Sequence, residues 1–100
     1  MKSQQTFMVE VTFYSRARKM VPEAVYRPHF VMELDEDREY LGVEIYDIEV
    51  DALDSAGYAM CSFLYEQEDI GYSKIRLNKS FKVMEGASVV GRGKIMSFSL

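Results

Sequence analysis

The 100-residue sequence has little of the side-chain chemistry on which cross-links, metal sites and many enzymes depend. It contains a single cysteine, Cys61, so no disulfide can form within the chain, which fits a reducing compartment. Cys61 stands among apolar residues in "YAMCSFLY", which predicts a small buried thiol rather than an activated nucleophile. The single histidine, His29, has no motif around it, so we expect a structural or surface role, with a general base or a ligand as the alternative. We therefore expect no enzyme activity, no metal site and no cofactor.

Long apolar runs are also missing from the sequence. No stretch approaches the ~18 apolar residues that suggest a membrane span, and the start "MKSQQTF" lacks the apolar region of a signal peptide. We therefore expect a soluble cytoplasmic protein without a membrane partner. Six glycines and two prolines exclude a low-complexity or collagen-like chain. An apolar content of 48% in 100 residues suits one domain, residues 1–100, with a substantial core.

The net charge of −4 is unevenly distributed along the chain. Residues 34–54 contain nine acidic residues and one basic residue, whereas the other residues together have a net charge of +4. This separation of charge indicates surfaces for partners of opposite sign, although a merely solvated face is the simpler interpretation.

Alternation of apolar and polar residues predicts an all-β protein. In "TFMVEVTFY" (6–14), the side chains of Phe7, Val9, Val11 and Phe13 share one side of a half-buried strand. We expect further strands, or in one case a strand pair, at 25–34, 40–50, 58–66, 75–83 and 89–100, with loops or turns at 15–24, 35–39, 51–57, 67–74 and 84–88. Pro28 cannot donate to a strand ladder, so the second strand starts there, lies at an edge or bulges. No window shows sustained helical periodicity, and about six strands without helices predict an antiparallel sandwich or barrel.

A small barrel is attractive because closure removes exposed strand edges. It also explains the glycines of the last strand, "VVGRGKIMSFSL" (89–100), since Gly91 and Gly93 would permit a sharp bend and a close backbone approach. Gly86 lies in a predicted hairpin turn, where the backbone often requires a positive φ. We expect Val90, Ile95 and Phe98 to point inward.

Three motifs resemble the C-terminal domain of elongation factor Tu. "FKVMEGASVVGRGKI" (81–95) resembles the closing hairpin of that domain, "YRPHF" (26–30) is similar to its Tyr-Arg-Pro-Gln-Phe, and "FMVEVTFYS" (7–15) is similar to its first strand. The motifs occur in the family's order and together span nearly the whole chain. The resemblance implies a six-stranded antiparallel Greek-key β-barrel that has no catalytic residues.

The resemblance also implies binding functions. In the full factor this domain helps to hold the T-stem backbone of aminoacyl-tRNA, packs on the GTPase domain and contacts the exchange factor. The family's turn glycine near the tRNA falls on Gly86, and its basic pair falls near Arg18 and Lys19. The present chain departs from the family because it has no GTPase domain, because "GRGK" (91–94) lacks the spacing of a phosphate-binding loop, and because Ala87 replaces the second turn glycine. These departures favour a role other than tRNA delivery.

Two binding hypotheses follow from the sequence. The first is a non-catalytic module that binds a protein partner, for which the resemblance suggests the translation apparatus, or a second copy of the chain. In this hypothesis an acidic strand face makes the contact. Its candidate residues are Glu44, Asp47, Glu49 and Asp51. The last three alternate along the chain, so we expect them to share one face of a strand. The alternative is RNA, and tRNA in particular, bound through phosphate contacts with basic residues. Its candidates are Arg16, Arg18, Lys19, Arg27, Gly86 and Arg92, with Lys82 near the closing hairpin.

Overall fold

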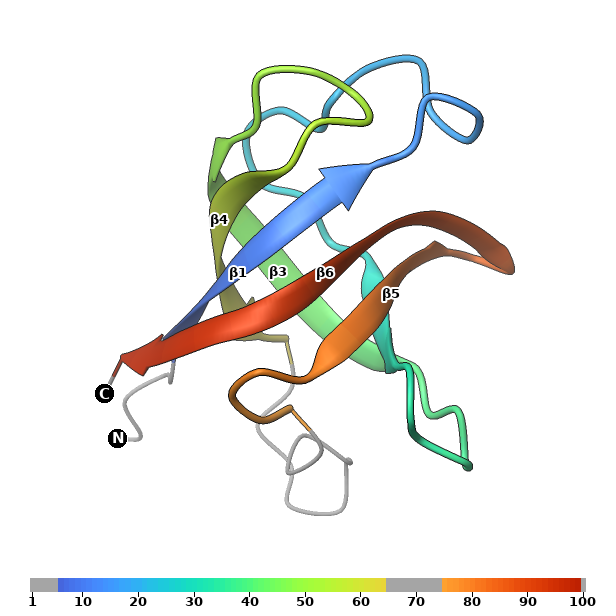
Figure 1. Cartoon of the computed structure of the whole chain (residues 1–100), viewed down its shortest axis with the longest axis vertical. Helices are drawn as coiled ribbons and strands as arrows, with labels where there is room; N and C mark the ends of the chain where they lie inside the picture. The colour runs from blue at the N-terminus through green and yellow to red at the C-terminus, as the bar shows by residue number, and fades with distance from the viewer. Residues whose placement is uncertain (1–5, 65–74, 100) are drawn as a thin grey trace.

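The computed structural model describes residues 6–64 and 75–99, and these residues form six β-strands with no helix among them. The strands are β1 (Thr6–Phe13), β2 (His29–Met32), β3 (Leu41–Glu49), β4 (Gly57–Phe63), β5 (Ser80–Glu85) and β6 (Ser88–Ser99). All neighbouring strands are antiparallel, and they close into a barrel in the order β1-β4-β3-β2-β5-β6 (Figure 1). The prediction of an all-β, six-stranded antiparallel barrel is confirmed.

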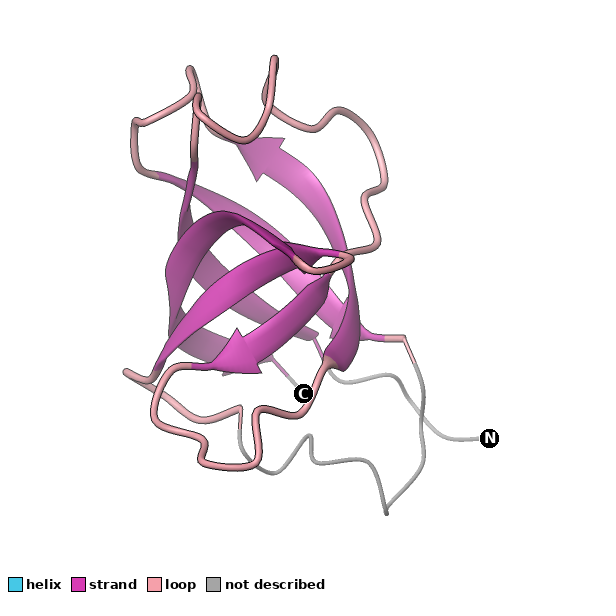
Figure 2. Cartoon of the chain, turned by 90° about the vertical axis from the view of Figure 1, so that its right-hand side faces the viewer, coloured by secondary structure: helices cyan, strands magenta, loops and turns pink. Residues whose placement is uncertain are grey.

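The strand order is that of a Greek key. Strands β2, β3 and β4 are neighbours in space as in sequence, while β1 lies beside β4 rather than beside β2. The long segment 14–28 therefore has to carry the chain across one end of the barrel, at the top of Figure 1. Seen from the side in Figure 2, the strands wrap around a common interior, and most of the loops lie at its upper and lower ends.

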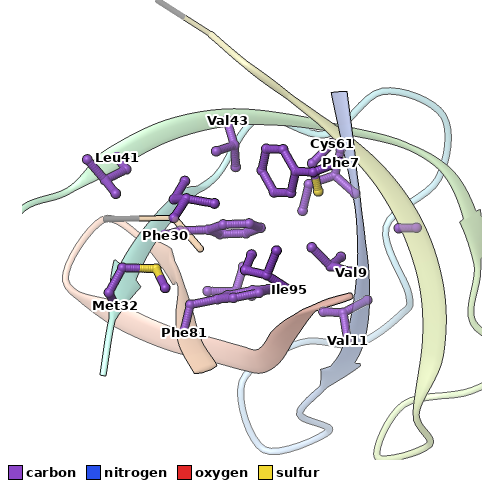
Figure 3. Close-up of a cluster of buried hydrophobic side chains, with 14 of the residues drawn as sticks. Phe7, Val9, Val11, Phe30, Met32, Leu41, Val43, Cys61, Phe81 and Ile95 are labelled. Atoms are coloured by element: carbon purple, nitrogen blue, oxygen red, sulfur yellow. The ribbon is translucent and has the colours of Figure 1, made fainter. Parts of the chain in front are cut away.

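Apolar side chains fill the interior of the barrel, as the alternation in the sequence predicts. The four predicted inward residues of β1, together with Leu41, Val43 and Ile45 of β3, are almost completely buried. Phe30 and Phe81 stack at the centre, with ring centroids 3.9 Å apart and an angle of 18° between the ring planes (Figure 3). Val90 and Ile95 of β6 are also buried, and Phe98 packs against the core.

The buried thiol of Cys61 is part of this core. Its side chain lies next to that of Phe7 in Figure 3. Burial raises the pKa of Cys61 far above the ordinary value of a thiol because the thiolate would lose its hydration. The prediction of a small buried thiol is confirmed, and the side chain is not an activated nucleophile.

The glycines of β6 allow the strand to lie close against β1. A Cβ atom at Gly91 would stand 2.5 Å from the carbonyl oxygen of Thr12, and one at Gly93 would collide with the carbonyl oxygen of Glu10 and with the ring of Phe81. Figure 1 shows β6 curving around the barrel over this region. The expected close approach of the backbone is therefore confirmed.

The closing hairpin turns more tightly than the sequence suggests. We expect a turn over 84–88, but β5 continues to Glu85 and β6 begins at Ser88, so that two residues, Gly86 and Ala87, make the turn. Gly86 has a φ of 59°, which confirms the expected positive φ at this position.

Two other strands are shorter than expected. β2 starts at His29, directly after Pro28, which agrees with the inability of proline to donate to the ladder. The strand expected over 75–83 starts only at Ser80, and Ile75 is buried although it lies in the loop before this strand. The expected loop 67–74 and the end of the strand expected over 58–66 lie outside the described residues.

A bulge interrupts β3 near its end. Tyr46 pairs with Met60 and Glu49 pairs with Tyr58, so three steps along β3 correspond to two along β4. Asp47 has a φ of 49°, in the left-handed region. The bulge turns Ile48 toward the core and keeps Glu49 on the outer surface.

Candidate functional site

A row of large side chains crosses the outer surface of three neighbouring strands. The strand register places Tyr46 of β3 opposite Met60 of β4, and Met60 opposite Met8 of β1. All three point away from the core and are partly exposed. They lie on the wall of the barrel that β3, β4 and β1 form in Figure 1.

Two further side chains enlarge this row. Tyr58 of β4, two positions before Met60, is 45% exposed. Met96 of β6 is the extra residue at the point where the register between β1 and β6 shifts. It lies in the sheet beside the pair of Met8 and Ser97, and it is 38% exposed. We call the five residues Met8, Tyr46, Tyr58, Met60 and Met96 the methionine–tyrosine face. Methionine and tyrosine are enriched at protein interfaces, because the first adapts its shape and the second combines apolar area with a hydrogen-bonding group.

Acidic side chains surround the methionine–tyrosine face. Tyr58 lies between two of them, because Glu49 of β3 and Glu10 of β1 are its direct neighbours in the sheet. Partial burial raises the pKa of Tyr46, and the negative charges of Asp47 and Glu44 add to this effect. The face therefore has a negative electrostatic environment.

A hollow of about 480 Å³ adjoins the methionine–tyrosine face at Tyr46. Its walls combine apolar side chains with polar surface and come from the segment after β1 and from the bulged end of β3. They are formed by Val21, Pro22, Glu23, Ala24, Val25, Tyr46, Asp47, Ile48 and Val50. We call this hollow the valine pocket. Two of its lining residues, Glu23 and Asp47, are exposed acids.

The four acidic residues expected at a protein contact have different positions. Glu44 and Glu49 lie on the outer face of β3, and Asp47 lies in the bulge between them. Asp51 follows the end of β3 and is exposed in the next loop. The expectation that Asp47, Glu49 and Asp51 alternate along one strand face is therefore wrong, because the bulge breaks the alternation.

Among the basic candidates, Arg18 is engaged inside the molecule. Its guanidinium forms an ion pair with Glu85, lies over the ring of Tyr26 at 5.1 Å and donates from Nε to the carbonyl oxygen of Met20. The hydroxyl of Tyr26 donates to the same Glu85 carboxylate. The structure thus brings Arg18 to Glu85, the residue before Gly86, and commits the charge of Arg18 to that carboxylate.

The other basic candidates are more scattered. Arg27 pairs with Glu44 at 3.0 Å, and Arg16 lies over the ring of Tyr14 at 4.3 Å. Lys19 is exposed in the segment after β1. Arg92 lies on the outer surface of β6, directly opposite Lys82 of β5. The structure therefore brings Lys82 and Arg92 together and leaves the complete set distributed over several surfaces.

No group of three or more His, Cys, Asp or Glu side chains in the described ranges could hold a metal ion. The ring of His29 contacts that of Tyr40, with centroids 5.8 Å apart. Within residues 6–64 and 75–99, no helix is long and apolar enough to cross a membrane.

The methionine–tyrosine face was not predicted, although the sequence contains the pattern that indicates it. Met8 and Met60 occupy outward positions in strands whose inward positions are already apolar. Large apolar side chains at solvent-facing positions of an alternating strand indicate a surface that something else covers. The local sequence pattern does not show that β3, β4 and β1 lie side by side, and it does not show the bulge at Asp47.

Comparisons of the chain with protein-family models, with curated proteins and with solved structures gave no match. The resemblance to the C-terminal domain of elongation factor Tu thus stays a prediction from its motifs.

Proposed function

We propose that this barrel is a non-catalytic binding module that engages a protein partner. One observation above all supports the proposal: partly exposed methionine and tyrosine side chains lie together on the outer surface of β3, β4 and β1, with acidic residues beside them. Apolar area within a polar rim is the usual composition of a protein interface. The motif resemblance makes the translation apparatus the first place to look for the partner, and the lack of a disulfide framework favours the cytoplasm.

The charge pattern favours protein over RNA as the partner. Binding to phosphates requires cations that are free to replace counterions. Arg18 and Arg27 are instead paired with Glu85 and Glu44, and the chain has an overall charge of −4. A negative surface with exposed methionines is poorly suited to a polyanion and well suited to a polypeptide.

The test is capture from an extract of the native host by the immobilised chain. Bound proteins are compared between the unaltered chain and a variant with both Met8→Gln and Met60→Gln, which keeps the barrel core intact. The control is Leu34→Gln, which changes a residue that is 86% exposed in the segment after β2, a strand that pairs with neither β1 nor β4. We expect a protein that the control retains and the double variant loses. Retention by both variants, or the absence of any retained protein, would contradict a contact through this face.

RNA binding is the second candidate, and the arrangement of Lys82 and Arg92 favours it. Two like charges directly opposite each other on neighbouring strands destabilise a sheet, so a ligand that neutralises both would compensate for that cost. Titration of labelled tRNA at several salt concentrations tests this function. Binding that falls steeply with salt and is lost in the Lys82→Ala, Arg92→Ala variant would support it, and no binding at low salt would exclude it.

A homo-oligomer is a version of the same proposal, and sedimentation velocity over a range of concentrations tests it. If a second copy is the partner, the molecular mass will rise with concentration, and the Met8→Gln, Met60→Gln variant will remain a monomer.

A further inference from the structure

We infer that the methionine–tyrosine face and the valine pocket together form a docking site for a basic amphipathic segment of a partner protein. The inference rests on the proposed function and defines the chemistry of the partner. The segment would place its apolar side chains on the methionines and tyrosines, insert an aliphatic side chain into the valine pocket, and direct its Lys or Arg side chains to the surrounding acids.

The dimensions of the site suit a single helix or strand. Neighbouring strands in a sheet lie about 4.8 Å apart, so a row across three strands spans roughly 10 Å, which is about the diameter of a helix with its side chains. The row formed by Met8, Met60 and Tyr46 has this width. Tyr46 also lines the valine pocket, so the row of side chains leads directly to the hollow.

Methionines suit the apolar part of this contact. Their flexible, polarisable side chains adjust to the shape of an incoming aliphatic or aromatic group. Met8, Met60 and Met96 come from three neighbouring strands and converge on one surface, whereas Met32 is part of the core.

The charges around the site select a basic partner. Glu10 and Glu49 lie on either side of Tyr58, and Glu23 and Asp47 line the valine pocket. The ion pairs Arg18–Glu85 and Arg27–Glu44 involve none of these four acids. Two basic residues of β6 lie at the far edge: Lys94 is opposite Glu10, and Arg92 is opposite Thr12, so the acidic character is strongest on the β3 side of the face. A ligand with two or three positive charges would therefore gain electrostatic complementarity and a faster association rate.

The same charges argue against a second copy of this chain as the occupant. In a symmetric dimer, the same patch of both subunits forms the interface. Glu10, Asp47 and Glu49 would then face the acids of an identical surface, and like charges opposed across an interface disfavour association. RNA is disfavoured on this surface for the same reason.

The experiment is a titration of the chain, labelled with ¹³C at its methionine methyl groups, with a designed 18-residue peptide of leucine and lysine in helical alternation. An otherwise identical peptide with glutamate in place of lysine is the matched control. We expect the methyl signals of Met8, Met60 and Met96 to shift in two-dimensional NMR spectra, and those of Met32 and Met84 to stay. The affinity should fall as salt is added, and the acidic peptide should bind at least tenfold more weakly.

Variants of the chain separate the site from a general attraction to negative charge. Asp47→Asn with Glu49→Gln should weaken the binding of the basic peptide about fivefold or more, because two neighbouring acids are removed. Glu36→Gln with Asp37→Asn removes two exposed acids from the segment between β2 and β3 and should change the affinity less than twofold. Thermal unfolding of each variant shows whether the fold is preserved.

Several results would overturn the inference. These are shifts confined to Met32 or Met84, equal binding of both peptides, equal effects of the two variant pairs, and no binding of the basic peptide at millimolar concentration. Self-association that shifts Met8 and Met60 without peptide would make a second copy the occupant. In each of these cases the extract experiment can still identify a protein partner, so failure of this inference is distinguishable from failure of the proposed function.

Discussion

The guanidinium of Arg18 and the carboxylate of Glu85 form an ion pair across 67 positions of sequence. The pair joins the segment after β1 to the closing hairpin, and Tyr26, farther along the same segment, donates to the same carboxylate. Arg18 has only 19% of its side chain exposed, so this contact is less screened by solvent than an ordinary surface pair.

A double-mutant cycle measures this contact. We expect Arg18→Met and Glu85→Gln to be coupled by about 0.5–1 kcal/mol in the free energy of unfolding, a modest value because Glu85 is 38% exposed. Urea denaturation of the two single variants and the double variant gives the coupling, and strictly additive effects would contradict it. Charge reversal at Arg18 would also disturb this contact, so Lys19 and Arg92 are cleaner positions for testing RNA binding.

The stability of the barrel should fall at high pH because of Tyr26. Burial raises the pKa of Tyr26 from 10.0 to about 12, although the nearby charge of Arg18 opposes the shift. The unfolded chain therefore loses this proton near pH 10, while the folded chain keeps it. The contribution of Tyr26 to the free energy of unfolding is present below pH 10 and is lost between pH 10 and 12. We expect the free energy of unfolding of Tyr26→Phe, measured by urea denaturation, to depend less on pH between pH 10 and 12. An unchanged slope in the variant would refute the assignment to Tyr26.

Alanine should be tolerated at Gly86 and not at Gly93. At Gly93 the added methyl group meets the backbone of Glu10 and the ring of Phe81, and we expect a loss of about 3 kcal/mol or more. At Gly86 nothing lies within 4 Å, so only the positive φ opposes the change, at a cost of about 1 kcal/mol. Denaturation of both variants decides the matter. A Gly93→Ala variant as stable as Gly86→Ala would show that β1 and β6 are farther apart than the structure indicates.

Ala24→Gly should stabilise the protein. Ala24 has a φ of 55°, a conformation that an L-residue adopts at a cost of about 1–2 kcal/mol and glycine adopts freely. Because glycine also makes the unfolded chain more flexible, we expect a net gain of up to about 1 kcal/mol. Ala56→Gly is the control, since Ala56 is exposed and has no positive φ, and it should be neutral or destabilising. Thermal denaturation that ranks the two variants in the opposite order would contradict this account.

The thiol of Cys61 should be protected in the folded protein. It is fully buried and its pKa is raised by burial, so its thiolate is scarce and inaccessible. We expect labelling by a thiol reagent to be slow in buffer and rapid in denaturant, and destabilising variants such as Gly93→Ala to accelerate it. Rapid labelling of the stable protein would show that the core opens locally at β4.

The sequence predicted those features that depend on local pattern. The alternation in β1 and β3, the start of β2 after Pro28 and the turn at Gly86 all follow from side-chain period or backbone restriction. The role of Gly91 and Gly93 was also predictable, because a glycine inside a strand marks a place where another backbone segment approaches closely.

Features that depend on distant contacts were not predictable. Nothing near Ile75 in the sequence indicates that this residue is buried from a loop, and nothing near Arg18 indicates a partner in the closing hairpin. The bulge at Asp47 arises where β3 and β4 lose their common register, which requires knowing that they are paired. The candidate docking site was missed for this reason, because it exists only when three strands lie side by side.

The register places Thr6 in β1 opposite Ser99 in β6, so the first and last strands close the barrel together. During synthesis, β1 can pair with β4 early but must wait for β6 until almost the entire described chain has left the ribosome. Until then β1 and β5 each have unpaired backbone groups that another nascent chain could engage. Chains truncated within β6 should therefore associate with one another, and this would affect their expression before they encounter any partner.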